Sequence, residues 1–119
     1  MTQKTWDELR AVSPGRYVLQ GTEPVPEPDL LAWAAWFETA DRRVAWTEVA
    51  PGLEISTIFL GLDYGWLSPV PLLFETMVFR DGDGAEGERY ATWHDAEQGH
   101  KTMVDLVQGT PPAPPRKDS

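Results

Sequence analysis

Two apolar stretches in the middle of the chain, Glu54–Leu60 and Leu72–Phe79, constrain the fold more than any other feature. Apolar residues occupy both odd and even positions of each stretch, whereas a strand with one face in water alternates apolar and polar residues. Both stretches have the length of a strand, and glycine or proline stands beside them. The pattern predicts two strands that are either covered on both faces or lie at the centre of a sheet.

The segment 29–40 has the features of a helix. Asp29 precedes a dense run of apolar residues, and its carboxylate can accept hydrogen bonds from the free amides of a first helical turn. The apolar residues recur at helical spacing and form a wide stripe. We expect this helix to be mostly buried, with Trp33 and Trp36 packed in the core.

A second helix is predicted over 93–108. Thr92 is a suitable N-cap residue, and Gly109 is a suitable C-terminal stop. An apolar stripe at helical spacing includes His100, whereas His94 lies in the first turn and off the stripe. The two histidines therefore lie on different faces and do not form an i, i+4 metal pair.

The rest of the chain divides into shorter segments: a capped helix from Thr5 ended by Ser13-Pro14-Gly15, short strands at 17–19 and 90–91, a Pro-rich connector over 21–28, a strand over 44–49 and a polar loop over 80–89. Together these assignments predict a single α+β domain over residues 1–109. Its antiparallel sheet has three to four strands, with helices 29–40 and 93–108 packed on it. Residues 110–119 are rich in proline and are predicted to be a disordered tail.

Charge and composition exclude several classes of function. The formal net charge is −9, so the chain repels nucleic-acid phosphates and anionic membranes. The chain has no cysteine, which excludes disulfides and thiolate chemistry. No apolar run is long enough to span a bilayer, and the N-terminus does not read as a signal peptide. These features predict a cytoplasmic protein that uses no cofactor or metal and binds neither nucleic acid nor membrane directly.

The loop between the two central strands, Gly61-Leu62-Asp63-Tyr64-Gly65-Trp66, is the most unusual segment. A tight turn does not require Tyr64 and Trp66 near its tip. The two rings and Asp63 indicate either a recognition loop with aromatic anchors or a lid in which the rings fold over the sheet edge.

Two further residues are candidates for chemistry. Glu75 lies inside an apolar strand, where a carboxylate is costly unless it is paired. It is a functional acid or base, a structural ion-pair partner of Arg16, Arg42 or Arg43, or an exposed residue if one face of the sheet is open. His100 is either a hydrogen-bonded core residue or part of a site.

Three segments carry a resemblance to a known family: Ile55–Asp63, Pro71–Phe79 and Tyr90–His100. They resemble motifs of the form STxFLGLDH, LFETMxF and TWxxAxxGH in a family of small phage and prophage proteins. The likeness covers 41 to about 107, and position 64 is Tyr where His is usual. The resemblance implies a phage-type accessory protein without an assigned activity, and it draws attention to Asp63, Glu75 and His100, one in each motif.

The sequence therefore favours a non-enzymatic accessory protein that binds a macromolecular partner, with Asp63, Tyr64, Trp66, Glu75 and His100 as candidate binding residues. The first alternative is a small enzyme or metal-dependent site built on Asp63, Glu75 and His100. A second alternative is a polyanion mimic with acidic residues clustered on one face. Strand 44–49, if it lies at the edge of the sheet, could pair across a two-fold axis in a homodimer.

Overall fold

A computed structural model describes residues 15–65 and 67–109 as an α+β fold with two antiparallel sheets. The larger sheet has four strands in the order β3-β4-β5-β6, with β3 at Arg43–Ala50, β4 at Leu53–Phe59, β5 at Phe74–Arg80 and β6 at Asp83–Tyr90. Strands β1 (Tyr17–Gln20) and β2 (Glu23–Pro26) form a separate two-stranded hairpin. The helices are α2 (Leu30–Thr39) and α3 (Trp93–Gln108). The α+β class and the antiparallel pairing are confirmed.

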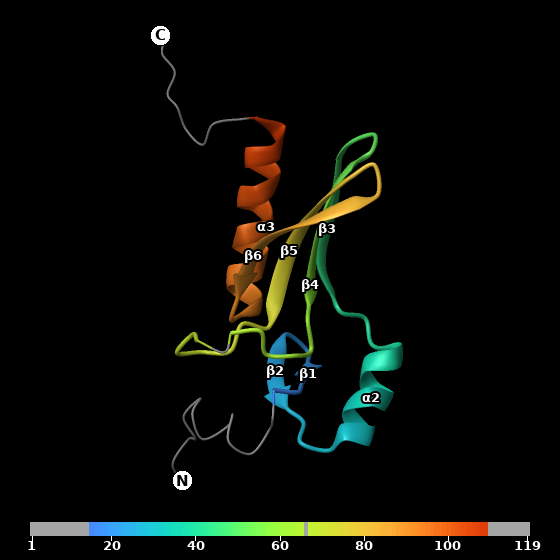
Figure 1. The fold of residues 1–119 in the computed structure, drawn as a ribbon, viewed down its shortest axis with the longest axis vertical. Coiled ribbons are helices and arrows are strands. Elements are labelled where there is room, and N and C mark those ends of the chain that lie inside the picture. The colour runs from blue at the N-terminus through green and yellow to red at the C-terminus, as the bar shows by residue number, and fades with distance from the viewer. Residues whose placement is uncertain (1–14, 66, 110–119) are drawn as a thin grey trace.

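Helix α3 packs across the four-stranded sheet, whereas α2 lies at one end of it beside the β1–β2 hairpin (Figure 1). Both caps are as predicted. The Asp29 carboxylate accepts from the amides of Leu31 and Ala32, and the Thr92 hydroxyl accepts from the amide of Asp95. The expectation that both helices pack on one sheet is correct for α3, while α2 packs chiefly against β1.

Three assignments from the sequence are corrected. The segment 80–89 is not a loop: a tight turn after Arg80 leads into β6, whose pairing with β5 satisfies its backbone without apolar side chains. The Pro-rich segment 21–28 is extended but contains β2, because an edge strand tolerates proline. Helix α2 has no fully buried residue, since it packs through one side only. The helix expected after Thr5 and the tail 110–119 lie outside the described residues.

A row of aromatic rings forms the core and joins α2 to α3. Trp36 meets Phe59 edge-on at 5.9 Å, Phe59 packs on Phe74 at 5.3 Å, and Phe74 meets Trp93 at 6.2 Å. Phe59 and Phe74 are completely buried, as is Tyr17 of the hairpin. Offset and edge-on ring contacts of this kind add to the stability that burial alone gives. The core therefore connects both helices and both sheets.

Gly99 lies where α3 comes closest to the sheet. A Cβ atom at this position would collide with the ring of Tyr90 on β6. A glycine inside a helix normally costs about 1 kcal/mol relative to alanine, so Gly99→Ala would ordinarily stabilise the protein. We expect the opposite, a loss of about 1–3 kcal/mol in the free energy of unfolding, because the added methyl group overpacks this contact. Chemical denaturation measures it. In a Tyr90→Leu background the same change should cost nothing further, and an equal loss there would contradict the explanation.

Candidate functional site

The four-stranded sheet has one face under α3 and one face that no described element covers. Along β4 and β5, the cross-strand pairs Thr57–Thr76 and Phe59–Phe74 point toward α3, because Thr57 bonds to His100 of that helix. Side chains alternate along a strand, so the intervening residues point the other way. We call this second surface the open face. Of the two alternatives for the apolar strands, the central position is the one observed, because β4 and β5 lie between β3 and β6.

His100 lies on the α3 side, in the core. Its Nε2 is 2.9 Å from the Thr47 hydroxyl and its Nδ1 is 2.8 Å from the Thr57 hydroxyl, which in turn lies 2.6 Å from the Thr76 hydroxyl. The ring is only 4% exposed. Burial lowers the pKa of His100, so the neutral imidazole donates through one nitrogen and accepts through the other. This arrangement satisfies a polar row inside the core.

Glu75 lies on the open face and is 7% exposed. Its Oε2 accepts from Nε of Arg89, on the neighbouring strand β6, at 3.3 Å. The guanidinium of Arg89 also lies 5.0 Å from the centroid of the Tyr64 ring. Glu75 therefore forms a structural ion pair, one of the alternatives that the sequence left open. Its partner is Arg89 rather than Arg16, Arg42 or Arg43. The sequence does not point to Arg89, because the polar residues of 80–89 do not have the pattern of a strand.

The loop 61–65 is held in place by backbone contacts. Gly61 has a φ of 78°, in the left-handed region that favours glycine, and its carbonyl accepts from the Tyr17 amide at 2.9 Å. The Asp63 carboxylate accepts from the amides of Gly65 at 2.7 Å and Leu72 at 3.3 Å. Asp63 therefore shapes the turn. Trp66 lies outside the described residues.

Tyr64 is the residue of this loop that reaches the open face. Its side chain is 45% exposed, and one side of its ring is stacked by Arg89. The ring is therefore not a lid buried over the core. Tyr64, Arg89 and Glu75 form one contiguous group at the end of the open face nearest the loop.

The structure does not bring Asp63, Glu75 and His100 together. Glu75 follows the alternation opposite to Thr76, so it points away from the face on which His100 lies. The Asp63 carboxylate accepts hydrogen bonds from the amides of Gly65 and Leu72. Across residues 15–65 and 67–109, no group of three or more His, Cys, Asp or Glu side chains could hold a metal ion. A shared acid–base site on these three residues is excluded, because its members must reach one proton.

The middle of the open face carries residues that the sequence did not single out. Trp46 of β3 is 44% exposed and lies opposite Ser56 of β4. The guanidinium of Arg43 lies over the Trp46 ring, 6.0 Å from its centroid. Glu48 of β3 lies directly opposite Glu54 of β4. The period-two pattern Trp46, Glu48 in the predicted strand 44–49 could have indicated one exposed face.

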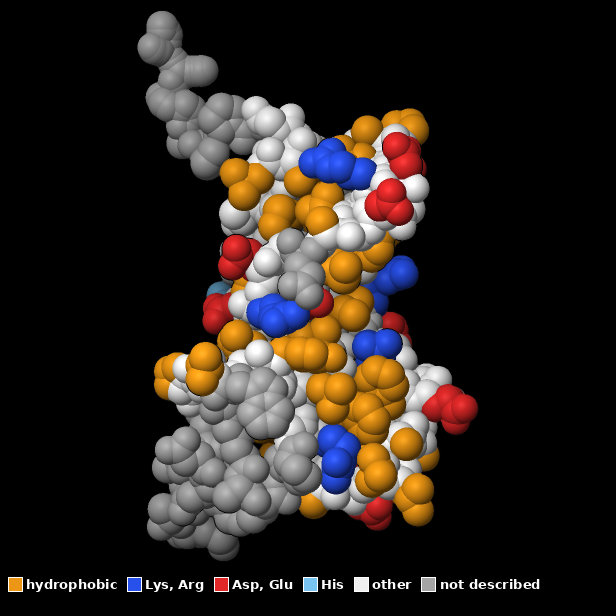
Figure 2. All heavy atoms as spheres, viewed as in Figure 1, with side chains coloured by type: hydrophobic (Ala, Val, Ile, Leu, Met, Phe, Trp, Pro, Cys, Tyr) orange, Lys and Arg blue, Asp and Glu red, His pale blue; other side chains and the backbone are white. Residues whose placement is uncertain are grey.

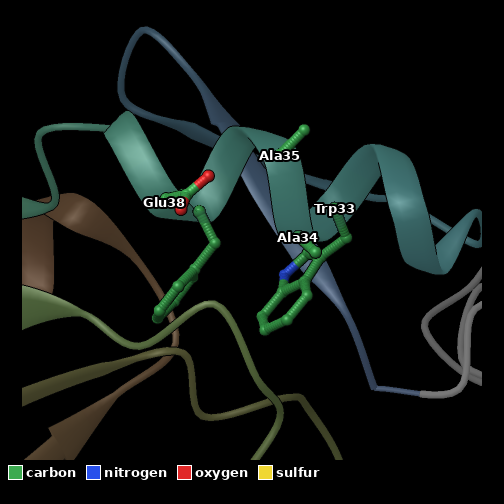
Figure 3. A pocket seen from close by; sticks show the side chains of 5 residues that line it. Trp33, Ala34, Ala35 and Glu38 are labelled. Atoms are coloured by element: carbon green, nitrogen blue, oxygen red, sulfur yellow. The ribbon is translucent and has the colours of Figure 1, made fainter.

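A hollow of about 410 Å³ lies along α2 (Figure 3). The residues that line it all belong to this helix: Trp33, Ala34, Ala35, Phe37 and Glu38. The indole of Trp33 points away from the helix toward the β1 strand and the 61–65 loop (Figure 3). Its Nε1 donates to the carbonyls of Tyr17 and Gly61, each at 3.1 Å. Because no second element forms an opposite wall, the hollow does not have the convergent polar groups of an active site.

Comparison of the chain with protein-family models, with curated proteins and with solved structures finds no match. Neither helix in the described part of the chain is long and apolar enough to cross a membrane.

Proposed function

We propose that this chain is a non-catalytic accessory protein that binds a macromolecular partner, most simply another protein, through the open face. The observation that carries the proposal is the exposed Trp46 on a sheet face that continues through half-buried Ile58, Met77 and Phe79. Hydrophobic side chains run along the middle of the molecule, where Figure 1 draws the sheet (Figure 2). A contiguous apolar surface with polar residues at its margin is typical of an interaction site.

The composition of the open face supports binding rather than catalysis. Trp, Tyr, Met and Arg are the residue types enriched in protein interfaces, and Trp46, Tyr64, Met77 and Arg89 bring all four to one surface. The ion pair of Glu75 with Arg89 fixes the position of the guanidinium that stacks on Tyr64. Such ordering lowers the entropy that a partner must remove on binding.

The phage-type role and the cytoplasmic location belong to this proposal as well. The first is supported by the three motif resemblances at Ile55–Asp63, Pro71–Phe79 and Tyr90–His100. The second is supported by the absence of cysteine in the sequence, which fits a reducing compartment. The net charge of −9 also favours a protein partner over direct contact with nucleic acid.

Affinity capture from host-cell extract with matched variants tests the proposal. Trp46→Ala combined with Tyr64→Ala should reduce the recovery of captured partner at least tenfold, because exposed aromatic anchors carry much of the binding energy of an interface. The matched control is Leu31→Ala combined with Leu106→Ala, which truncates two exposed apolar residues on the helices. Thermal unfolding must show that both double variants remain folded. Equal capture by the two folded variants would contradict binding through the open face.

A further inference from the structure

The outer edge of β3 differs from the other edge of the sheet. Strand β3 pairs with β4 on one side only, and within the described residues no strand or helix lies along its outer side (Figure 1). An edge strand presents unpaired backbone N–H and C=O groups that can pair with another chain. Proteins usually protect such an edge with charged residues, proline, bulges or a covering segment.

The opposite edge, β6, carries several of these protections. Its charged residues include Asp83, Glu88 and Arg89, and its register with β5 shifts between Glu75 and Met77. Strand β3 has no proline, and its charged residues are Arg43 and Glu48. Its register with β4 shifts near both ends and is regular over 45–48. The regular part of this edge is therefore suited to one added strand of about four residues.

The charges next to this edge favour a basic occupant. Glu48 and Glu54 lie directly opposite each other on the open face, an arrangement of like charges that destabilises a strand pair. Neither carboxylate has a hydrogen-bond or ion-pair partner among the described residues. In the described part of this face, the guanidinium of Arg43 lies over the Trp46 ring and that of Arg89 over the Tyr64 ring.

We propose, on the basis of the binding function argued above, that the partner contributes an extended basic segment that adds to β3 as a fifth strand. Residues of such a segment that lie opposite Trp46 and Glu48 point to the open face, since alternate residues of a strand share a face. A Lys or Arg at these positions can contact the exposed Trp46 ring and the carboxylates of Glu48 and Glu54. Backbone hydrogen bonds then give affinity, and the alternating basic residues give specificity.

A second copy of this chain fits the edge less well. Each copy has a formal charge of −9, so two copies repel each other, whereas a basic segment is attracted over a longer range. The predicted homodimer through 44–49 is therefore the competing outcome of the test.

The test uses the full chain and blocked ten-residue peptides. The first peptide alternates threonine and lysine, the second alternates threonine and glutamate, and the third alternates proline and lysine. We expect the Thr-Lys peptide to bind and to protect the amides of β3 in hydrogen exchange. The Thr-Glu peptide should not bind measurably. The Pro-Lys peptide should bind at least tenfold more weakly, because proline cannot donate backbone hydrogen bonds.

Two double variants make the result specific. Glu48→Gln combined with Glu54→Gln should weaken binding of the Thr-Lys peptide about tenfold or more. The control is Glu97→Gln combined with Asp105→Asn, which removes the same charge from exposed positions on α3. The control should change the affinity by less than about twofold. Three results would overturn the inference. The two double variants could lose the same affinity, or the Thr-Lys and Pro-Lys peptides could bind equally well. Alternatively, without any peptide, the protein could have the mass of a dimer and already show protected β3 amides. If the peptides fail but capture still depends on Trp46 and Tyr64, the open face binds a partner of another kind and the proposed function stands.

Discussion

Phe59→Ala is expected to lower the free energy of unfolding by about 3–5 kcal/mol, the range for removing a buried aromatic ring from a core. Phe59 is completely buried and holds the middle of the aromatic row, between Trp36 at 5.9 Å and Phe74 at 5.3 Å. Its loss removes the apolar surface of the ring and leaves a cavity between α2 and the sheet, because neighbouring rings relax only in part. Urea denaturation followed by tryptophan fluorescence measures the change.

Two further variants show whether the position or the residue type is responsible. Phe79→Ala makes the same chemical change on β5, but Phe79 lies on the open face and is only partly buried, so we expect less than half the loss. Phe59→Leu retains most of the buried volume and should cost less than about 1.5 kcal/mol. It also provides a measurable variant if Phe59→Ala does not fold. A loss at Phe79 equal to that at Phe59 would mean that the aromatic row is not the centre of stability.

The elements that could be predicted are those whose signals are local. The caps at Asp29 and Thr92 depend on a side chain and on amides two or three residues away, and both form as expected. The central strands were found because a long apolar run bounded by turn residues has few other uses. Strand β6 was missed because its polar residues are stabilised by pairing with β5, a contact that is not local.

The candidate site was harder to predict because the central strands carry apolar residues at both odd and even positions. Such a pattern does not say which face a helix will cover, and a choice of one face decides whether Thr76 or Glu75 points toward α3. The structure places Thr76 on that side, which separates Glu75 from His100. It joins Glu75 instead to Tyr64 through Arg89. A shift of one residue in the strand would thus decide between an acid–base site and the surface proposed here for binding.

His100→Ala is expected to cost about 2–4 kcal/mol in the free energy of unfolding. The change removes a buried ring and leaves the Thr57 hydroxyl, which is completely buried, with one partner fewer. Thr47 also loses its contact with Nε2. His94→Ala is the matched control, because His94 is exposed and its loss should change stability by less than about 0.5 kcal/mol.

The pH dependence of stability distinguishes the role of His100 from simple packing. Burial holds the pKa of His100 in the folded protein below its ordinary value of 6.5, so the unfolded chain binds the proton more readily. The stabilising contribution is complete above that value and is lost as the pH falls below 6.5 toward the folded-state pKa. The original chain and His94→Ala should therefore both lose this stability on acidification, and His100→Ala should not. If all three chains show the same slope between pH 7.5 and about 5, the imidazole is not held neutral by the core.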